Sequence, residues 1–433
     1  MWQQLQQKIV NRRANVGVIG LGYVGLPLAV EFAKAGFTVT GIEVDRHRAT
    51  SIAAGRSYIP DVPTGELAGL VKAGRLRATG DFKALAKTDA VIICVPTPLR
   101  KTREPDISFI LAAAEQVAQT THPGQAIVLE STTYPGTTEE TILPKMVAKG
   151  LKVGQDFFLA FSPERIDPGN QRFTTKNIPK VVGGVTKRCT QIVRLLYSQV
   201  IDTVIPVSSP KAAEMVKLLE NTFRSVNIGL VNEIALVCDR FDLDVWEVID
   251  AARTKPFGFM AFYPGPGLGG HCLPSDPIYL SWKARMHGFE ARFIELAAQV
   301  NGYMPQHVVG KVIEGLNEHS RALKGSRVLV LGVAYKKDVN DTRDAPSIEI
   351  ISMLRKKGAV VSYHDPFIPR FLVGGKPVPH VKLTAPVLQH HDIAVIVSEH
   401  SSVDYPFVVR HIPQIIDTRN VLKMIRSPKI IKL

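Results

Sequence analysis

The chain has 433 residues, with 53 lysines and arginines against 39 aspartates and glutamates, and a formal net charge of +14 at neutral pH. Hydrophobic residues make up 45% of it and charged residues 21%, which excludes a disordered or collagen-like protein. The length predicts two or three globular domains. The charge is compatible with nucleic acid, an anionic membrane surface or small phosphorylated ligands, but the basic residues are dispersed, so a solvated surface is the simplest interpretation.

The four cysteines lie at positions 94, 189, 238 and 272 and form no CxxC pair. Their spacing argues against a zinc site and against a disulfide framework, so we expect no metal and a reducing compartment. An uncharged stretch at residues 16–30 follows basic residues, but four glycines and one proline within it argue against a secretion signal. No apolar run approaches the roughly 20 residues of a membrane span. We expect a cytoplasmic protein without stable membrane insertion.

The first 205 residues alternate short β-branched runs with helical patterns. This alternation is typical of a parallel sheet covered by helices, and it predicts a doubly wound, Rossmann-like domain at residues 1–205. The expected strands span residues 16–20, 38–44, 90–95, 126–130 and 157–161.

A glycine-rich loop follows the first expected strand. Residues 20–25 read Gly-Leu-Gly-Tyr-Val-Gly, which fits GxGxxG, and they lead into a helical pattern. Such a turn places a pyrophosphate on the amides at a helix N-terminus; a purely structural turn is the alternative. Glu43 lies 18 residues after Gly25, where a carboxylate accepts ribose hydroxyls. Glu43 favours NAD because it would repel a 2′-phosphate, whereas Arg46 and Arg48 would suit NADP.

From Pro210 a helical pattern reaches at least Ala252, with apolar residues on most faces. A helix that is apolar nearly all round is buried between other elements. We therefore expect residues 206–320 to form a helical connector that also joins subunits of a homodimer or larger homo-oligomer. Lys217, Asn221 and Arg224 form a polar stripe, which is either solvated or able to stabilise an oxyanion.

Three of the cysteines lie in apolar patterns or at a helix start and are interpreted as small hydrophobic residues. Cys272 differs, because it follows a glycine-rich segment at 264–270 and precedes Asp276 by four residues. If a helix starts here, the two side chains share one face and the thiol becomes a better nucleophile. A tight turn with an incidental thiol is the alternative. His271 is expected to position its neighbours rather than act as a base.

Around Lys324 the alternation of strands and helices returns. Strands are expected at residues 327–331, 360–363 and 393–397, and a helix at 347–357, which predicts a second α/β domain at residues 321–433. The expected fold class is therefore α/β, with two Rossmann-like doubly wound domains joined by a long central helix and helical region.

The ordered motifs resemble the UDP-glucose/GDP-mannose dehydrogenase family over nearly the whole chain. They are the GxGYVGLP start, VPTP at 95–98, EST at 130–132, FSPER at 161–165, the Lys217/Asn221 helix, the GGHC…DP loop at 269–277, YKKD at 335–338 and DTR at 341–343. The resemblance implies an NAD-dependent, four-electron oxidation of a sugar C6 alcohol to a carboxylate, with two NAD per product.

By this resemblance Cys272 captures the intermediate aldehyde as a thiohemiacetal, which the second oxidation converts to a thioester. Lys217 and Asn221 donate hydrogen bonds to its oxyanion. Water held by Asp276, with help from Thr132 and Lys217, removes the hydroxyl proton of the substrate.

The resemblance also implies that Glu164 and Asp276 activate the water that hydrolyses the thioester, and that Lys336 neutralises the nucleotide diphosphate. It assigns to the cofactor Gly20, Gly22, Tyr23, Val24, Gly25, Glu43, Arg48, Pro96, Thr97, Thr132 and Arg343. It assigns to the substrate Glu164, Arg165, Lys217, Asn221, Phe262, Tyr263, Gly269, Tyr335 and Lys336.

The sequence departs from the UDP-glucose branch of the family. The glutamate expected four residues after Glu164 is Pro168 here, and an arginine from the neighbouring subunit has no clear counterpart near Pro256. Residues 255–267 instead resemble bacterial UDP-N-acetylglucosamine 6-dehydrogenases, which serve O-antigen and capsule polysaccharide biosynthesis. Aromatic surface in place of a charged contact suits an N-acetyl group. We expect UDP-N-acetyl-D-glucosamine as the substrate, with UDP-glucose and UDP-N-acetylgalactosamine as alternatives.

Two other classes of protein fit parts of the sequence. A basic nucleic-acid-binding protein with a vestigial Rossmann domain would fit the charge, but basic and aromatic residues are not interleaved on one module, so no nucleic acid is expected. A single-step hydroxyacid dehydrogenase would fit the dinucleotide loop, but it would have no use for Cys272.

Overall fold

The computed structural model describes residues 1–433 except 101, 103, 168–169, 171 and 271, so the expectations for Pro168 and His271 lie outside the described residues. The chain divides into two compact units. Unit 1 comprises Met1–Glu220 and Ile278–Gly288, and unit 2 comprises Asn221–Pro277 and Phe289–Leu433.

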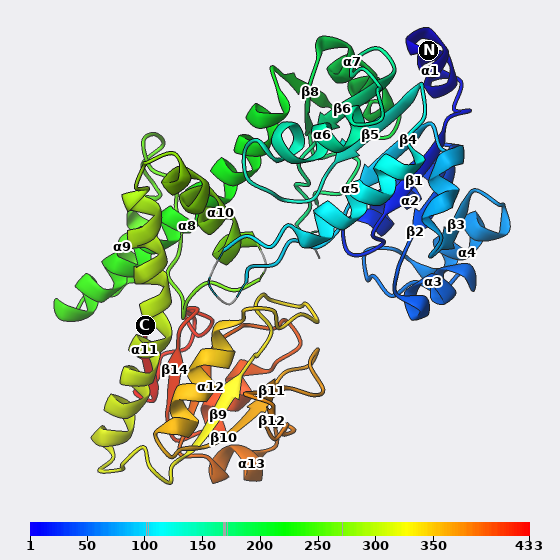
Figure 1. Cartoon of the computed structure of the whole chain (residues 1–433). Coiled ribbons are helices and arrows are strands. Elements are labelled where there is room, and N and C mark those ends of the chain that lie inside the picture. The colour runs from blue at the N-terminus through cyan, green and yellow to red at the C-terminus, as the bar shows by residue number, and fades with distance from the viewer. Residues whose placement is uncertain (101, 103, 168–169, 171, 271) are drawn as a thin grey trace. The chain divides into compact units, whose positions relative to one another are not determined.

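Unit 1 is built on an eight-stranded sheet (Figure 1). Its strands are β1 (Asn15–Ile19), β2 (Thr38–Ile42), β3 (Leu76–Thr79), β4 (Ala90–Ile93), β5 (Gln125–Leu129), β6 (Phe157–Phe161), β7 (Lys180–Gly184) and β8 (Val204–Val207). The spatial order is β3-β2-β1-β4-β5-β6-β7-β8, and the first six strands run parallel. This is the strand order of dinucleotide-binding folds. β7 and β8 continue the sheet, with β7 antiparallel to β6.

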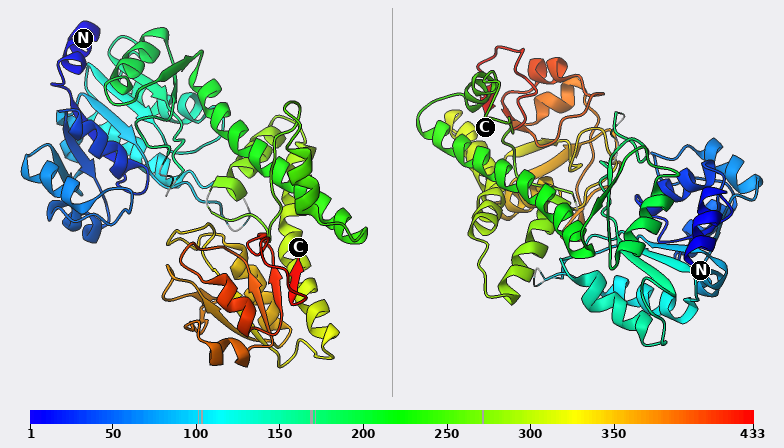
Figure 2. Two further views of the ribbon diagram at one scale, coloured as in Figure 1. Left: turned by 180° about the vertical axis from the view of Figure 1, so that it is seen from behind. Right: turned by 90° about the horizontal axis from the view of Figure 1, so that it is seen from above.

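Helices cover both faces of this sheet (Figure 2). Along β4, Ala90 and Ile92 join one apolar cluster with residues of α1, α2 and α7, whereas Val91 and Ile93 join a second with residues of α5. Strands buried on both faces explain the continuous apolar runs of the sequence. The bounds are α1 (Trp2–Val10), α2 (Gly25–Lys34), α3 (Arg46–Ala53), α4 (Thr64–Lys72), η1 (Phe82–Lys87), α5 (Ser108–Thr120), η2 (Thr137–Ile142), α6 (Leu143–Val147) and α7 (Lys187–Tyr197).

Unit 2 contains a second parallel sheet of five strands in the order β10-β9-β13-β14-β15. These are β9 (Arg327–Leu331), β10 (Val360–His364), β13 (Ile393–Ile396), β14 (Ile415–Asp417) and β15 (Ile430–Lys432), beside a short hairpin of β11 (Leu372–Val373) and β12 (Lys376–Pro377). The accompanying helices are α12 (Pro346–Lys356), α13 (Ala385–His390) and α14 (Tyr405–His411). The predicted α/β class with two parallel sheets is confirmed.

The helical stretch predicted from Pro210 to Ala252 has these bounds, but it consists of two helices rather than one continuous helix. α8 (Pro210–Arg240) ends before Asp242, which has a φ of 54° in the left-handed region. Asp244 then caps α9 (Val245–Ala252) by accepting the N–H of Trp246 at 2.9 Å. A left-handed residue followed by an N-cap carboxylate ends one helix and starts another.

Two more helices complete the helical region: α10 (Cys272–Met286) and α11 (Arg292–Glu318). None of the helices in the described part of the chain combines the length and apolarity needed to cross a bilayer.

Candidate active site

The GxGxxG loop lies between β1 and α2. Gly20 has a φ of 86°, a backbone conformation that residues with a side chain rarely adopt. A Cβ atom at Gly25 would collide with the carbonyl oxygen of Gly20, so the turn itself requires both glycines. Among the described residues, no atom lies within 4 Å of the place where Gly22 would carry a Cβ. This open side lets a pyrophosphate approach the loop and the N-terminus of α2, and Tyr23 and Val24 complete the turn.

Glu43 lies directly after β2 and is buried, with 6% of its surface exposed. Its carboxylate accepts the backbone N–H of Leu21 at 3.1 Å and that of Asp45 at 3.0 Å, which ties it to the glycine loop. The Arg48 guanidinium lies over the Tyr58 ring, 5.5 Å from its centroid, and the Tyr58 hydroxyl donates to the Leu21 carbonyl at 2.6 Å. The cradle and the carboxylate beside it fit the pyrophosphate and the ribose of NAD.

The loops after β4 and β5 lie at the same edge of the sheet. Pro96 and Thr97 follow β4, and the buried Thr97 offers its carbonyl to the Tyr279 hydroxyl at 3.0 Å. The Ser131 hydroxyl accepts the backbone N–H of Val95, in the loop after β4, at 2.9 Å, which ties that loop to the start of the loop that carries Thr132. The predicted cofactor residues of unit 1 therefore all follow the carboxyl ends of parallel strands.

Lys217 and Asn221 lie one turn apart on α8, and both are buried, with 8% and 6% of their surfaces exposed. The alternative of a solvated stripe is wrong for these two residues, whereas Arg224 is exposed. The Lys217 ammonium donates to the backbone carbonyl of Glu164.

The Glu164 carboxylate lies in the loop after β6 and accepts the N–H groups of Arg165 and Ile166, each at 2.7 Å. Burial opposes its ionisation, but the charges of Lys180 and Lys217 and these two N–H groups together lower the pKa of Glu164. Arg165, predicted to contact substrate, pairs its guanidinium with Glu220. Lys180 was not predicted as a site residue.

In unit 2, Cys272 is the first residue of α10 and its thiol is partly exposed, whereas Cys94, Cys189 and Cys238 are buried; none of the four forms a disulfide within the described part of the chain. A thiolate at a helix N-terminus is stabilised by the helix dipole. Asp276 follows one turn later and is buried, and it accepts the Asn221 amide at 2.5 Å. Within unit 2, α10 therefore carries a thiol at its first residue and a buried, hydrogen-bonded carboxylate one turn later.

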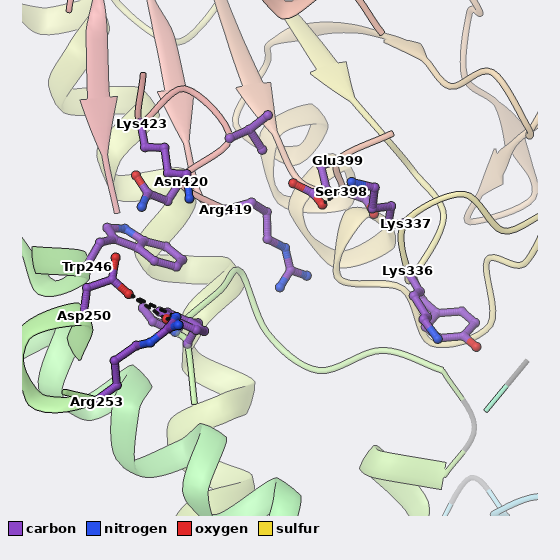
Figure 3. Close-up of a pocket in the computed structure, with 14 residues that line it drawn as sticks. Trp246, Asp250, Arg253, Lys336, Lys337, Ser398, Glu399, Arg419, Asn420 and Lys423 are labelled. Atoms are coloured by element: carbon purple, nitrogen blue, oxygen red, sulfur yellow. Dashed lines mark hydrogen bonds and ion pairs between the residues drawn. The ribbon is translucent and has the colours of Figure 1, made fainter. Parts of the chain in front are cut away.

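Unit 2 also contains a cavity of about 610 Å³ at the carboxyl edge of its sheet (Figure 3). Strand order reverses between β9 and β13, so the cavity lies at the topological switch point where open α/β sheets bind ligands. Loops after β9, β13 and β14 line it together with residues around α9. The lining residues are Trp246, Asp250, Arg253, Tyr263, Pro264, Tyr335, Lys336, Lys337, Ser398, Glu399, Arg419, Asn420, Val421 and Lys423.

Five basic side chains line this cavity against two acidic ones, so it suits an anionic ligand. Figure 3 shows the Arg419 guanidinium extending into the space between Trp246 and the loop of Lys336 and Lys337. Burial lowers the pKa of Arg419 to about 10, so it stays charged at neutral pH. Arg419 was not predicted as a site residue, because no recognisable motif surrounds it.

One wall of the cavity is aromatic. Trp246 stacks on Tyr263 with ring centroids 5.7 Å apart and planes 15° from parallel. The buried indole nitrogen of Trp246 and the side-chain oxygen of Asn420 have no hydrogen-bond partner among the described residues. A flat apolar surface with polar atoms beside it suits a nucleobase, while the cations suit phosphates.

Besides Asn221, Cys272 and Asp276, three further predicted residues of unit 2 lie outside the cavity lining. Phe262 packs edge-on against Phe223, with centroids 5.7 Å apart. Gly269 lies against Tyr335, where a Cβ would come within 2.8 Å of the Tyr335 Cβ. Arg343 pairs with Asp341 of its own loop at 2.6 Å. Tyr263, Tyr335 and Lys336 are brought together as predicted.

A dinucleotide cradle, a thiol at a helix N-terminus and a cationic cavity with an aromatic wall define an NAD-dependent oxidoreductase that acts on a nucleotide-linked substrate. Within the described residues, no group of three or more His, Cys, Asp or Glu side chains is placed to hold a metal ion.

Models of the UDP-glucose/GDP-mannose dehydrogenase family match three successive segments: the NAD binding domain at residues 14–201, the central domain at 211–303 and the UDP binding domain at 329–424. The chain is 36% identical to a UDP-N-acetyl-D-glucosamine 6-dehydrogenase of Pseudomonas aeruginosa, over 82% of this chain and 83% of that protein. It is 38% identical to protein CapL of Staphylococcus aureus, over 81% and 82% of the two chains.

Among solved structures, a UDP-D-ManNAc dehydrogenase from Pyrococcus horikoshii superimposes with a TM-score of 0.88 at 31% identity, over 96% of this chain and 98% of that one. The chain belongs to the UDP-glucose/GDP-mannose dehydrogenase family. It is an NAD-dependent nucleotide-sugar 6-dehydrogenase, and NAD is its cofactor.

The glycine loop gives a matched pair of variants. Gly22→Ala is expected to leave the free energy of unfolding unchanged and to raise the KM for NAD about tenfold, since its Cβ takes only space that the pyrophosphate approaches. Gly25→Ala is expected to cost about 1–3 kcal/mol of stability, because its Cβ meets the Gly20 carbonyl. Urea unfolding and NAD titrations measure both effects. Equal losses of stability in the two variants would contradict this interpretation of the loop.

Glu43 determines the preference for NAD in our interpretation. Glu43→Gln is expected to raise the KM for NAD and to narrow the preference over NADP, because an amide does not repel a 2′-phosphate. The ratio of kcat/KM for the two cofactors measures this change in preference. The control is Glu66→Gln, which removes the charge that Glu66 of α4 pairs with Lys34 of α2. A parent chain that prefers NADP would refute the assignment.

Proposed function

We propose that this chain oxidises C6 of UDP-N-acetyl-D-glucosamine to the carboxylate of UDP-N-acetyl-D-glucosaminuronate through a covalent intermediate on Cys272. The observation that carries the mechanism is the position of the Cys272 thiol at the start of α10, one turn before the carboxylate of Asp276 that Asn221 holds. The relative from Pseudomonas aeruginosa supports the choice of sugar.

A second candidate substrate is UDP-N-acetyl-D-mannosamine, which the similar Pyrococcus horikoshii structure favours. The two sugars differ in configuration at C2, so the distinction depends on contacts of the N-acetyl group. UDP-glucose and UDP-N-acetylgalactosamine remain the further alternatives from the sequence.

Four electrons leave the C6 carbon when an alcohol becomes a carboxylate, so NAD is used as two equivalents. When bound, NAD supplies the two-electron acceptor for each oxidation. In the first, Asp276 holds the water that takes up the hydroxyl proton, with Thr132 and Lys217 assisting.

The Cys272 thiolate then attacks the aldehyde carbon, so that a C–S bond forms and the carbonyl oxygen becomes an oxyanion. Lys217 and Asn221 donate hydrogen bonds to this oxyanion, and both are buried, where such donors are most effective. After the second oxidation the carbon is a thioester. Water that Glu164 and Asp276 deprotonate attacks it, the C–S bond breaks, and the thiolate is regenerated.

The uridine diphosphate fits the cavity of unit 2. Lys336 and Arg419 are the cations that neutralise the diphosphate, and the stack of Trp246 and Tyr263 supplies a surface for the base. This use of the basic side chains accounts for part of the net positive charge.

We further propose that the chain works in the cytoplasm as a homodimer or larger homo-oligomer and without nucleic acid. Exposed apolar side chains of α8, of the residue that follows it and of α11 border one groove in unit 2, which supports a second copy of the chain as its partner. They are Val237, Phe241, Tyr303 and Ile313.

The substrate assignment is tested by incubating the purified chain and NAD with each of the four UDP-sugars. We expect fastest turnover with UDP-N-acetyl-D-glucosamine and two NADH for each sugar acid formed. One NADH per product would indicate a single-step dehydrogenase. Activity confined to another of the sugars would overturn the substrate, and salt-dependent duplex binding without any NADH would favour the nucleic-acid alternative.

The covalent step is tested at Cys272. Cys272→Ser and Cys272→Ala are expected to lower kcat for net NADH formation by about a thousandfold or more, because the aldehyde can no longer be held as a thioester precursor. Cys238→Ala, at a buried thiol of α8, is the control and keeps its turnover. Normal steady-state turnover of the Cys272 variants would refute the mechanism.

A further inference from the structure

Unit 1 contains a buried cluster of one ammonium and two carboxylates that no motif of the sequence marked as a unit. The Lys180 Nζ lies 3.1 Å from Oε1 of Glu130 and 3.3 Å from Oε2 of Glu164. The exposed fractions of the three side chains are 6%, 0% and 11%. Buried charges are retained only when they are paired this closely.

The topology of the sheet brings these residues together. Glu130 follows β5, and Glu164 lies in the loop after β6, at the same edge. Lys180 is the first residue of β7, and because β7 runs antiparallel to β6, its start lies at the edge where β6 ends. The ammonium is therefore held between two active-site loops by strand pairing rather than by a flexible segment.

Other titratable groups face the cluster from each element packed against it. Tyr197 of α7 donates to Glu130, and its ring centroid lies 5.0 Å from the Lys180 ammonium. Cys94, after β4, lies 3.9 Å from Glu130. Burial raises the pKa of Tyr197 and that of Cys94, so both are neutral at neutral pH. Lys217 of α8 reaches the backbone carbonyl of Glu164.

The two carboxylates respond differently to the shared ammonium. Burial raises the pKa of Glu130 to about 7, although Lys180 opposes the shift. The pKa of Glu164 is lowered, because Lys180, Lys217 and two backbone N–H groups together outweigh its burial. Two carboxylates that share one cation cannot both ionise freely, and the pair titrates as a unit.

We propose that Lys180 is a positioning residue of the dehydrogenase reaction. Its ammonium holds Glu164 in place as a carboxylate, while Glu130 carries a proton, so that the cluster has no net charge. The proposal rests on the proposed function, in which Glu164 activates water for thioester hydrolysis. Lys180 acts through Glu164 and does not touch the substrate.

A merely structural ion pair would affect stability and leave the pH dependence of turnover in place. Three variants separate the two roles: Lys180→Met, Glu130→Gln and the double variant. Lys180→Met leaves both carboxyl groups without their cation. The double variant also removes the cation, but it replaces the carboxyl group of Glu130, so that no second carboxylate can form beside Glu164. Lys180→Arg retains the charge.

The measurement is kcat for NADH formation as a function of pH, with the UDP-sugar that the parent chain oxidises fastest. In Lys180→Met the acid limb of the profile is expected to move to higher pH by about one to three units, because protonation of Glu164 becomes easier. Glu130→Gln is expected to keep the limb in place or move it to lower pH. The double variant and Lys180→Arg are expected to lie between the parent and Lys180→Met.

The control is Lys145→Met, which removes an exposed ion pair of unit 1 in which the Lys145 Nζ lies 2.8 Å from Oε2 of Glu115. This variant is expected to leave the pH profile unchanged. If Lys180→Met does not fold, the double variant and Lys180→Arg still report the position of the limb. Acid limbs that coincide in all folded variants, with only kcat or stability reduced, would overturn the proposal.

A second readout needs no substrate. The pKa of Glu130 is raised in the parent, whose folded state therefore holds a proton that the unfolded chain loses near its ordinary carboxyl pKa, so the stability of the parent is expected to fall as pH rises from about 4.5 toward 7. In Lys180→Met the fall is expected to be larger, because the pKa of Glu164 is raised as well. The double variant lacks the part of the fall that Glu130 causes, and thermal unfolding at several pH values measures all three. A parent chain inactive on all four UDP-sugars overturns the proposed function and the role of Lys180 with it. An active parent with unmoved limbs overturns the role of Lys180 alone.

Discussion

Parallel hydrogen bonding in the two sheets is the constraint on which the arrangement of the sites depends. Strands that run parallel must each be entered from the same end, so all of their carboxyl ends meet at one edge. In unit 1 this edge gathers the glycine loop after β1, Glu43 after β2, Thr97 after β4 and Thr132 after β5. In unit 2 it gathers the loops after β9, β13 and β14 around one cavity. Residues distant in sequence become neighbours without any long-range motif.

Buried charges then fix these loops in place. Glu43 accepts N–H groups from the glycine loop and from its own loop, so one carboxylate joins β1 to β2. Lys180 joins the loops after β5 and β6 in the same way. Such groups contribute little net stability, since their desolvation offsets their attraction, but removing one partner leaves an uncompensated charge. Their consequence is therefore rigidity of the site and control of protonation, which is what acid–base chemistry in these loops requires.

Periodicity predicted the elements that packing alone determines. The strands expected at 157–161 and 327–331 agree with β6 and β9, because both are apolar runs buried in a sheet. The strand expected to reach Val44 ends at Ile42. The prediction was two residues too long because Val44 continues the apolar pattern of the strand, although its side chain is exposed. Motifs located Cys272, Asp276 and the glycine loop, whose chemistry depends on neighbours in sequence. Lys180 was missed because its partners come from other strands, and a lysine at the start of an apolar strand has no distinguishing pattern.

The division of the chain also bears on the proposed reaction. The cavity with Lys336 and Arg419, the Cys272 thiol and the Asn221–Asp276 pair all belong to unit 2, whereas the dinucleotide loop and Glu43 belong to unit 1. Oxidation by four electrons requires one NADH to leave and a second NAD to enter while the sugar stays bound. In the proposed reaction the substrate has two anchors, the cations at its diphosphate and the C–S bond at C6, and both belong to unit 2, although Lys217 and Glu164 of unit 1 also act on it. The groups that bind the cofactor share no residue with those anchors, so exchange of the cofactor does not require the release of either of them.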